Sequence, residues 1–224
     1  MRTKNKPLKA DFHLHTRWSP DSRTDPHRLV AYCRARGLGL IAITDHNTIA
    51  GALEVARLAP FPVIIGEEVK TADGDLIGLF LKEEVPRGLP AVDTAKGIKA
   101  QGGLVFLPHP YDTFRRSVIR KEVLPDLLPL VDAIEGFNAR NALGRANARA
   151  LSLAREHRKP TVAVSDAHHT LEIGKTYTIL PFYEGTPESL LAALQEASLV
   201  CCPSSPLVHA ITLTNKLLRR LGIS

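Results

Sequence analysis

The sequence predicts an α/β protein in which parallel strands alternate with helices and close into a small barrel. Short apolar runs of four to six residues recur along the chain, and each is followed by a polar turn and a helix-like segment. Continuous apolar runs of this length are typical of strands that are buried on both faces of a parallel sheet. About seven such units in 224 residues fit one compact closed barrel better than an open sheet.

The expected strands are the apolar runs, which are rich in Val, Ile, Leu or Phe and bounded by Gly, Pro or Asp. A first strand near the N-terminus alternates instead, with polar Asp11, His13 and His15 between apolar neighbours. The other expected strands cover residues 40–44, 62–65, 76–81, 104–107, 133–137 and 161–164.

The segments between these runs are predicted to be helices. Asp25 before Pro26 places an N-cap ahead of a proline at the first helical position, and Gly37 ends that helix. Thr186 opens the last helix with a capping pattern. The other expected helices cover residues 48–58, 92–100 and 142–157. We expect one domain over residues 1–224, with its core at about 10–200 and a tail at 203–224 that forms a helix and packs on the barrel.

The composition is that of a soluble globular protein with a basic surface. No apolar run approaches the roughly 20 residues needed to cross a bilayer, and the basic first residues lack the apolar segment of a secretory signal. We therefore expect a cytoplasmic protein with no membrane partner. The net charge of +6 favours anionic partners without choosing among nucleic acid, nucleotides and sugar phosphates. Nothing in the sequence sets the oligomeric state.

Metal-capable side chains follow nearly every predicted strand. Because the carboxyl ends of parallel barrel strands share one face, we expect these side chains to converge on one mouth of the barrel. Cysteine is not among them, since Cys33, Cys201 and Cys202 are odd in number and lack a CxxC spacing. The first strand itself contains Asp11, His13 and His15. The residues that follow the later strands are Asp45, His46, Glu67, Glu68, His109, Asn138, Asp166 and His168.

The spacing of these residues indicates a catalytic cluster of divalent ions. His13 and His15 are two residues apart, so both imidazoles face one side of a strand, and Asp166 and His168 repeat this spacing. Imidazoles and carboxylates without thiolates suit Zn, Mn or Fe. A carboxylate such as Glu68 can bridge two ions, and clustered ions can bind a phosphoryl group and generate hydroxide.

Five motifs in order resemble the PHP (polymerase and histidinol phosphatase) family. They are Asp-Phe-His-Leu-His-Thr at 11–16, Thr-Asp-His-Asn-Thr at 44–48, Gly-Glu-Glu-Val at 66–69, Pro-His-Pro at 108–110 and Ser-Asp-Ala-His at 165–168. The resemblance covers roughly residues 10–174. It implies a distorted seven-stranded parallel β/α barrel, similar to a TIM barrel, which holds two or three Zn, Mn or Fe ions and hydrolyses phosphoesters by metal-bound hydroxide.

The resemblance also implies a role for each ligand. His13, His15 and Asp166 would hold a first ion, with Glu68 as the bridging carboxylate. A second ion would be held by His46 and His168, with Asp21 from the loop after the first strand, and His109 would hold a remaining ion. Asp11 and Asp45 would orient imidazoles. Many relatives have a further histidine after the bridging glutamate, but the segment 75–79 has none, and Asn138 stands where some relatives have histidine or cysteine. The site of His109 is therefore expected to be short of protein ligands.

Substrate phosphates need cations beyond the metals. Arg115 and Arg116 follow His109, and Arg140 follows Asn138, so these arginines are expected on the active rim. Asp21 or His169 is expected to assist proton transfer.

The sequence leaves three hypotheses open. The chain is expected to be a phosphatase or phosphodiesterase for a small phosphorylated substrate or nucleotide. A nuclease acting on DNA or RNA ends is the first alternative, favoured by the basic charge but not by the 5% content of aromatic residues. A non-catalytic RNA-binding barrel is the second, and the retained metal-capable residues argue against it.

Overall fold

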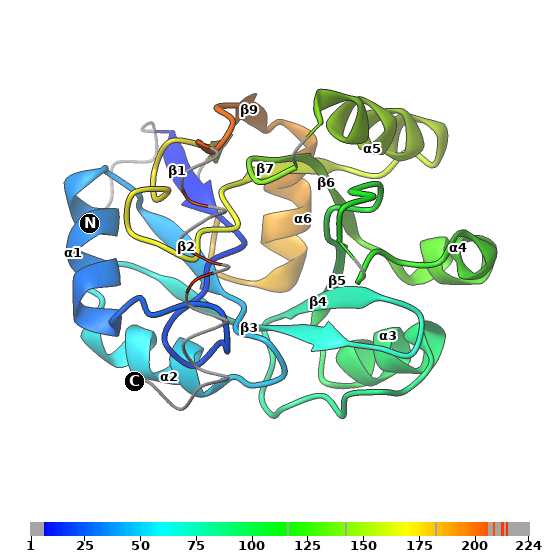
Figure 1. Cartoon of the computed structure of the whole chain (residues 1–224), viewed down its shortest axis with the longest axis horizontal. Helices are drawn as coiled ribbons and strands as arrows, with labels where there is room; N and C mark the ends of the chain where they lie inside the picture. Colours follow the sequence, from blue (N-terminus) through cyan, green and yellow to red (C-terminus); the bar gives the residue numbers. More distant parts are fainter. Residues whose placement is uncertain are drawn as a thin grey trace.

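The computed structural model describes residues 7–115, 117–141, 143–181, 183–205, 208, 212 and 214. Within them a nine-stranded sheet curls into a nearly closed barrel (Figure 1). The strands are β1 (Leu8–Asp11), β2 (Leu40–Ile43), β3 (Val63–Lys70), β4 (Asp75–Leu79), β5 (Leu104–Leu107), β6 (Ala133–Asn138), β7 (Thr161–Val164), β8 (Tyr177–Leu180) and β9 (Ser198–Val200). Their order is β7-β6-β5-β4-β3-β2-β1-β8-β9. The hydroxyl of Thr178 in β8 bonds to the backbone of Ala163 in β7 and draws the two ends of the barrel together.

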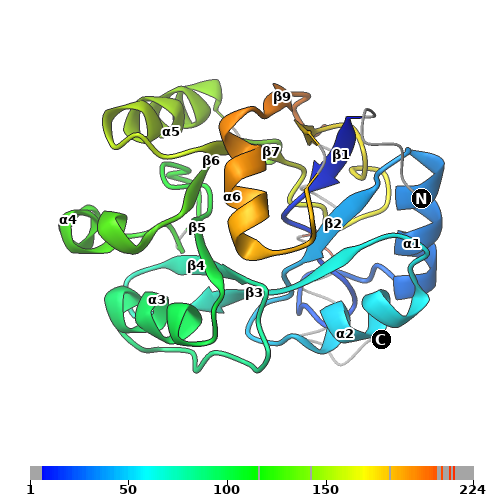
Figure 2. The same ribbon diagram turned by 180° about the vertical axis from the view of Figure 1, so that it is seen from behind.

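Helices surround this sheet, as Figures 1 and 2 show from opposite sides. They are α1 (Pro26–Ala35), α2 (Ala50–Leu58), α3 (Ala91–Ala100), α4 (Leu124–Leu127), α5 (Gly144–Glu156) and α6 (Pro187–Gln195), with 3₁₀ turns at Lys121–Val123 and Leu128–Leu130. The predicted caps are present: Asp25 accepts from two backbone N–H groups of α1, and Thr186 forms a capping box with Ser189.

The strand predictions are confirmed in position but not in direction. Each predicted run overlaps a strand, yet the prediction of seven parallel strands is wrong. β4 runs antiparallel to both β3 and β5, and β8 runs antiparallel to β1. The reason at β4 is the short connection after β3, in which Thr71 and Gly74 form a tight turn. A turn of this length can join antiparallel strands only, because a parallel crossover needs a dozen residues or more. β8, β9, α4 and the 3₁₀ turns were not anticipated.

The predicted alternation near the N-terminus continues past the end of β1. Leu14 forms an isolated parallel bridge with Ala167 and is fully buried among apolar residues. His13 and His15 are also fully buried, on the side away from Leu14. Strand-like pairing of this segment with the residues after β7 therefore brings its two histidines to the segment that contains Asp166.

The barrel is filled by a continuous apolar cluster that includes Phe12, Ile77 and Phe106, and α6 packs against it through Leu190. The rings of Phe12 and Phe106 are 5.9 Å apart and tilted. Two outer clusters lie under α1 and α2 and under α3, α4 and α5. A packed interior leaves the mouth at the carboxyl ends of the strands as the place for polar chemistry.

The predicted tail helix lies largely outside the described residues. Of its described residues, Val208 and Thr212 are buried, and Thr212 accepts a hydrogen bond from Arg140. This contact agrees with packing of the tail against the barrel. Within the described part of the chain, no helix has both the length and the apolar character that a membrane span requires.

Glu67 gives the fold a pH dependence that is separate from the chemistry at the mouth. Its Oε2 accepts from the backbone of Val85, and none of the described residues forms a hydrogen bond with its Oε1. Burial raises its pKa to about 7. A raised carboxyl pKa contributes stability that is complete below about pH 4.5 and is lost as the pH rises through about 7.

We therefore expect Glu67→Gln to reduce the loss of folding stability that accompanies a rise in pH. Thermal unfolding at pH 5 and pH 8 should show a smaller difference for the variant than for the wild type, on the order of 2 kcal/mol in unfolding free energy. Glu83→Gln, at an exposed position nearby, is the control and should behave as the wild type. Equal pH dependence in the wild type and Glu67→Gln would rule out this role of Glu67.

Candidate metal centre

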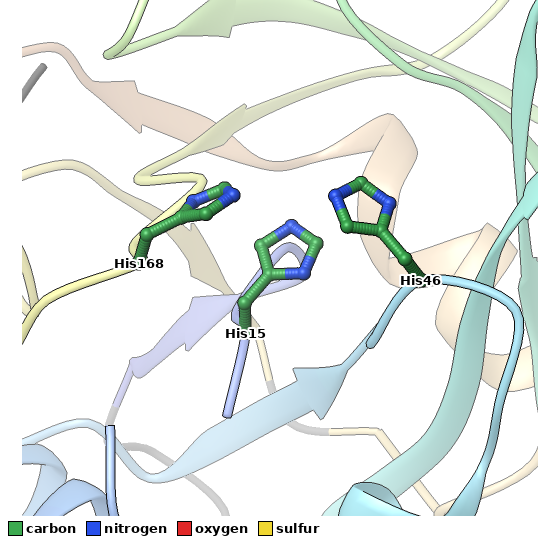
Figure 3. A group of neighbouring side chains, drawn as sticks. All are labelled: His15, His46 and His168. Atoms are coloured by element: carbon green, nitrogen blue, oxygen red, sulfur yellow. The ribbon is translucent and has the colours of Figure 1, made fainter. Parts of the chain in front are cut away.

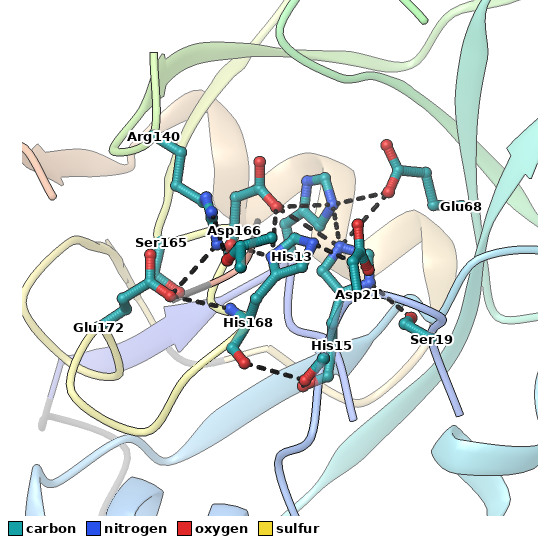
Figure 4. Close-up of polar contacts among 12 residues, drawn as sticks. His13, His15, Ser19, Asp21, Glu68, Arg140, Ser165, Asp166, His168 and Glu172 are labelled. Carbon is teal, nitrogen blue, oxygen red and sulfur yellow. Dashed lines mark hydrogen bonds and ion pairs between the residues drawn. The ribbon is translucent and has the colours of Figure 1, made fainter. Parts of the chain in front are cut away.

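All eight predicted ligands meet in one cluster at the mouth of the barrel. Figure 4 labels six of them, and Figure 3 adds His46. They come from the ends of strands that are distant in sequence, and all but His46 are buried. The ligands are His13, His15, Asp21, His46, Glu68, His109, Asp166 and His168.

The first group surrounds the Nε2 atoms of His13 and His15, which lie 3.0 Å apart. Oε2 of Glu68 lies 3.2 Å from the His13 nitrogen and 3.4 Å from the His15 nitrogen. Oδ1 of Asp166 lies 3.5 and 3.4 Å from the same two nitrogens and has no hydrogen-bond partner within the described part of the chain. Two imidazoles and two carboxylates thus face a common point, as the sequence predicted.

The second group is formed by His15, His46 and His168, whose rings converge in Figure 3. The ring centroid of His15 lies 4.6 Å from that of His46 and 4.1 Å from that of His168. Asp21 reaches both outer imidazoles, with Oδ2 3.5 Å from His46 Nε2 and Oδ1 3.3 Å from His168 Nε2. The loop after β1 therefore supplies the predicted carboxylate.

Glu68 lies at the centre of the cluster and joins its parts. Its Oε2 is 3.1 Å from Nδ1 of His46 in addition to its contacts with the first group. Its Oε1 points the other way, 3.1 Å from Nε2 of His109. A carboxylate whose two oxygens face different imidazole sets has the geometry of a bridging ligand.

Hydrogen bonds fix the proton on the outer nitrogen of three imidazoles. Nδ1 of His13 lies 2.6 Å from the carboxylate of Glu135, and Nδ1 of His168 lies 2.9 Å from the backbone oxygen of Asp166. Nδ1 of His15 lies 2.9 Å from Ser19 Oγ, which donates its own proton to Asp45. Since these partners accept, each Nδ1 donates its proton, and each Nε2 faces carboxylates with either a proton or a lone pair that can bind a metal ion.

Imidazole nitrogens and carboxylates that face one another across buried space need positive charge between them, which either protons or metal ions can supply. The residues present therefore fit a divalent metal centre, and the outer hydrogen bonds are those that orient imidazole ligands in metal sites.

The pKa shifts show the same need for positive charge. Burial alone would raise the pKa of both Asp166 and Glu68. Instead, Arg115 and His13 hold the pKa of Asp166 well below its usual range. His46 and His13 do the same for the pKa of Glu68. Burial would lower the pKa of His46, yet Glu68 and Asp21 raise it to about 9. Burial and the neighbouring His168 lower the pKa of His15 to about 3. The carboxylates remain ionised, as metal ligands must.

Comparison with protein families decides the relationship that these residues suggest. The model of the PHP domain matches residues 11–118, and the model described as PHP-associated matches residues 144–199. An uncharacterized protein of Methanocaldococcus jannaschii is 38% identical over 158 residues, which cover 65% of this chain and 90% of that protein. The chain belongs to the PHP family.

Solved structures share the fold of this PHP barrel. A Bacteroides vulgatus protein of two domains, described as containing a predicted PHP-like metal-dependent phosphoesterase, matches with a TM-score of 0.71 at 18% identity, over 94% of this chain and 70% of that one. The lesion-specific endonuclease EndoQ of Pyrococcus furiosus matches with a TM-score of 0.59 at 13% identity, over 87% of this chain and 58% of that one.

Two ligand positions of the PHP centre adopt backbone conformations that are uncommon outside glycine. The φ angle is 28° at His109 and 52° at Asp166. Such conformations cost on the order of 1–3 kcal/mol and persist where the surroundings fix them. Here both side chains are turned into the cluster, so the strain accompanies the placement of ligands.

Asp45 acts as the sequence predicted, although through an intermediate residue. Its carboxylate accepts from the backbone and hydroxyl of Thr16 and from Ser19, and Ser19 contacts the His15 ring. Asp11 is placed differently from the prediction. It accepts from the backbone of His13 and of Ser165, no described hydrogen bond joins its carboxylate to an imidazole, and burial raises its pKa to about 7.

Glu135 is a residue of the centre that sequence reasoning missed. Besides His13, its carboxylate accepts from the backbone of His109 and from the side chain of Asn138. Asn138 also donates to Asp166, which places it beside the ligands as predicted. The available signal was a glutamate inside an otherwise apolar strand, since a buried charge needs a partner.

We expect Glu135→Gln to weaken metal binding by about 10- to 100-fold without unfolding the protein, because the amide keeps the shape but not the charge that supports His13. Titration of activity with added metal would measure the shift. Activity should recover in part at high metal concentration, and an unchanged titration curve would show that Glu135 does not support the ligand.

The structure separates the predicted substrate residues. Arg115 reaches the centre, with Nη2 2.6 Å from Asp166 Oδ2. Arg140 is buried and bound to Glu172 and Thr212, so its contacts are with the protein. Arg116 lies outside the described residues. Nδ1 of His169 accepts from the backbone of Leu171, and no described hydrogen bond or ion pair joins this side chain to the cluster. Its role in proton transfer stays a prediction.

Proposed function

We propose that this chain is a metal-dependent phosphoesterase that hydrolyses the phosphate ester of a small molecule or nucleotide. The observation that carries the proposal is the buried cluster in which Glu68 connects two sets of imidazoles and carboxylates. Divalent ions bound there would polarise a phosphoryl group and lower the pKa of coordinated water. Membership of a family with solved phosphoesterase-like structures supports the same reaction class.

Arg115 is the residue best placed to hold a substrate phosphate. Its guanidinium is tied to Asp166 and Asp112 and approaches the cluster from the loop after β5. Guanidinium groups match the geometry of phosphate oxygens and carry their charge at every physiological pH. A phosphoryl group at the cluster could therefore be bound by Arg115 on its outer side.

A cavity of about 160 Å³ adjoins this loop, and its volume suits part of a small substrate. Its lining includes Tyr111, Phe114, Arg145 and Arg149, and it shares Asp112 with the environment of Arg115. Aromatic rings and arginines suit the non-reacting part of a phosphorylated molecule, such as a sugar or base.

A panel of substrates tests the proposal. Purified protein with added Mn²⁺ should release phosphate from phosphomonoesters or nucleotides, and excess chelator should abolish the activity. Absence of activity on sugar phosphates, nucleotides and diesters alike would contradict the proposal.

A nuclease is the alternative that the structure favours most. The net charge is +6, and two aromatic side chains on loops that also supply cluster residues are exposed, Trp18 by 48% and Phe114 by 70%. Such rings can stack on bases. They therefore weaken the argument against a nuclease that the low aromatic content of the sequence provides. Short oligonucleotides in the same panel separate the two functions, because the proposed enzyme releases phosphate from nucleotides and leaves oligonucleotides uncut.

We expect Arg115→Ala to raise KM for the best substrate of the panel by about 10-fold or more, because a charged contact to phosphate is lost. Arg120→Ala is the control, since Arg120 lies on the same loop but pairs with Asp73. Steady-state kinetics of both variants decide the point. Similar KM values for Arg115→Ala and the wild type would remove Arg115 from the substrate site.

A further inference from the structure

Asp75 is a buried carboxylate at the mouth of the barrel, and it is not one of the eight predicted ligands. It is the first residue of β4 and pairs with Lys70 across the hairpin. Its exposed fraction is 5%, and its backbone N–H donates to Ser117. The hairpin after β3 thus returns an acidic side chain to the strand that carries Glu68.

The side chain of Asp75 lies with Glu68 and His109, and one ligand atom from each residue falls within 4.8 Å of the other two. This is the side of Glu68 whose Oε1 faces His109, away from the other imidazoles. Nδ1 of His109 is buried and has no hydrogen-bond partner among the described residues. Among the residues that the structure describes, no Lys or Arg forms an ion pair with Asp75. The two imidazoles that lower the pKa of Glu68 most, His46 and His13, contact its other oxygen, Oε2.

We propose that Glu68, Asp75 and His109 form a carboxylate-rich cation site that selects a hard ion such as Mn²⁺, whereas the site of His15, His46 and His168 selects Zn²⁺. In this site, Asp75 takes the place of the histidine that many relatives have after the bridging glutamate and that segment 75–79 lacks. The inference rests on the proposed metal-dependent function and adds a difference in metal identity between neighbouring sites.

The difference follows from the donor atoms. Two carboxylates and one imidazole offer mainly oxygen, which suits Mn²⁺ and Mg²⁺. Three imidazoles offer nitrogen, which suits Zn²⁺. Three protein ligands leave open positions for water or substrate around an ion that prefers six oxygen ligands.

Metal binding by three forms of the protein tests the proposal. Protein loaded with Zn²⁺ and dialysed is titrated with Mn²⁺, and free Mn²⁺ is followed by electron paramagnetic resonance. The wild type should bind an additional Mn²⁺, and Asp75→Asn should weaken this step by about 10-fold or more while keeping its Zn²⁺. Asp75→His should bind Zn²⁺ in place of Mn²⁺ at this step. Asp93→Asn, at an exposed position on α3, should titrate as the wild type.

Unchanged Mn²⁺ affinity in Asp75→Asn would overturn the assignment. If that variant failed to fold by circular dichroism, crystals of the wild type soaked in Mn²⁺ would decide instead. An anomalous peak in contact with Asp75 supports the site, and a peak elsewhere or no peak overturns it. A wild type that binds neither Zn²⁺ nor Mn²⁺ would show failure of the proposed function as well.

Discussion

Asp166→Ala is expected to remove bound metal and phosphoesterase activity together. Oδ1 of Asp166 faces the nitrogens of His13 and His15, and Oδ2 holds Arg115 at 2.6 Å, so the substitution opens the first group and frees the substrate arginine. Loss of several kcal/mol of charge stabilisation corresponds to a fall of about 1,000-fold or more in kcat. Metal content by mass spectrometry and kcat on the same preparation measure both effects.

The controls for this variant separate chemistry from folding. Asp166→Asn keeps the volume of the buried side chain and is expected to lose metal equally, because the amide carries no charge. Asp126→Ala, at an exposed position on α4, should keep both metal and activity. Full turnover by a folded Asp166→Ala protein would show that the ligand assignment is wrong.

Glu68→Gln is expected to be the most damaging single change, since it acts on every group of the cluster. The carboxylate contacts His13, His15 and His46 through one oxygen and His109 through the other. Removal of its charge should weaken all metal binding, by about 100-fold or more, and lower kcat by at least the factor expected for Asp166→Ala.

Calorimetric titration with Zn²⁺ and with Mn²⁺ measures this effect. Glu68→Asp retains the charge but is too short to span the groups, so it should recover part of the affinity. His109→Ala should affect the ion beside Asp75 and leave the first group in place. A Glu68→Gln protein that binds the same number of ions as His109→Ala would show that Glu68 does not bridge.

The ligands could be predicted from the sequence because their signal is local. Each predicted strand is short and apolar, and a metal-capable residue follows it. Closure of the barrel then brings His46 after β2 and Asp166 after β7 to one mouth, whatever the length of the intervening helices. This geometry needs the parallel direction of β1, β2, β3, β5, β6 and β7, which the structure confirms.

Two residues of the centre, Glu135 and Asp75, do not follow a predicted parallel strand, and the sequence pattern therefore missed them. Glu135 sits inside β6, so a search for polar residues after strands passes over it. Asp75 begins a strand that runs antiparallel, and the start of such a strand reaches the same mouth as the ends of its neighbours. A search for a histidine in this segment could not find a carboxylate.

Arg140 is a residue that the sequence placed correctly at the mouth but whose partners it did not predict. Its place after β6 predicted a substrate contact, but position along the chain does not show which partner a side chain has. Glu172 and Thr212 bind its guanidinium from segments distant in sequence. Contacts of this kind are fixed by tertiary packing.

The metal-to-protein ratio of the wild type tests the central claim most directly. Protein dialysed against metal-free buffer is measured by plasma mass spectrometry, and its phosphatase activity is followed as a chelator is added. We expect about two or more ions per chain and a parallel loss of ions and activity. A chain that holds almost no metal, yet hydrolyses phosphoesters at an undiminished rate in chelator, would contradict it.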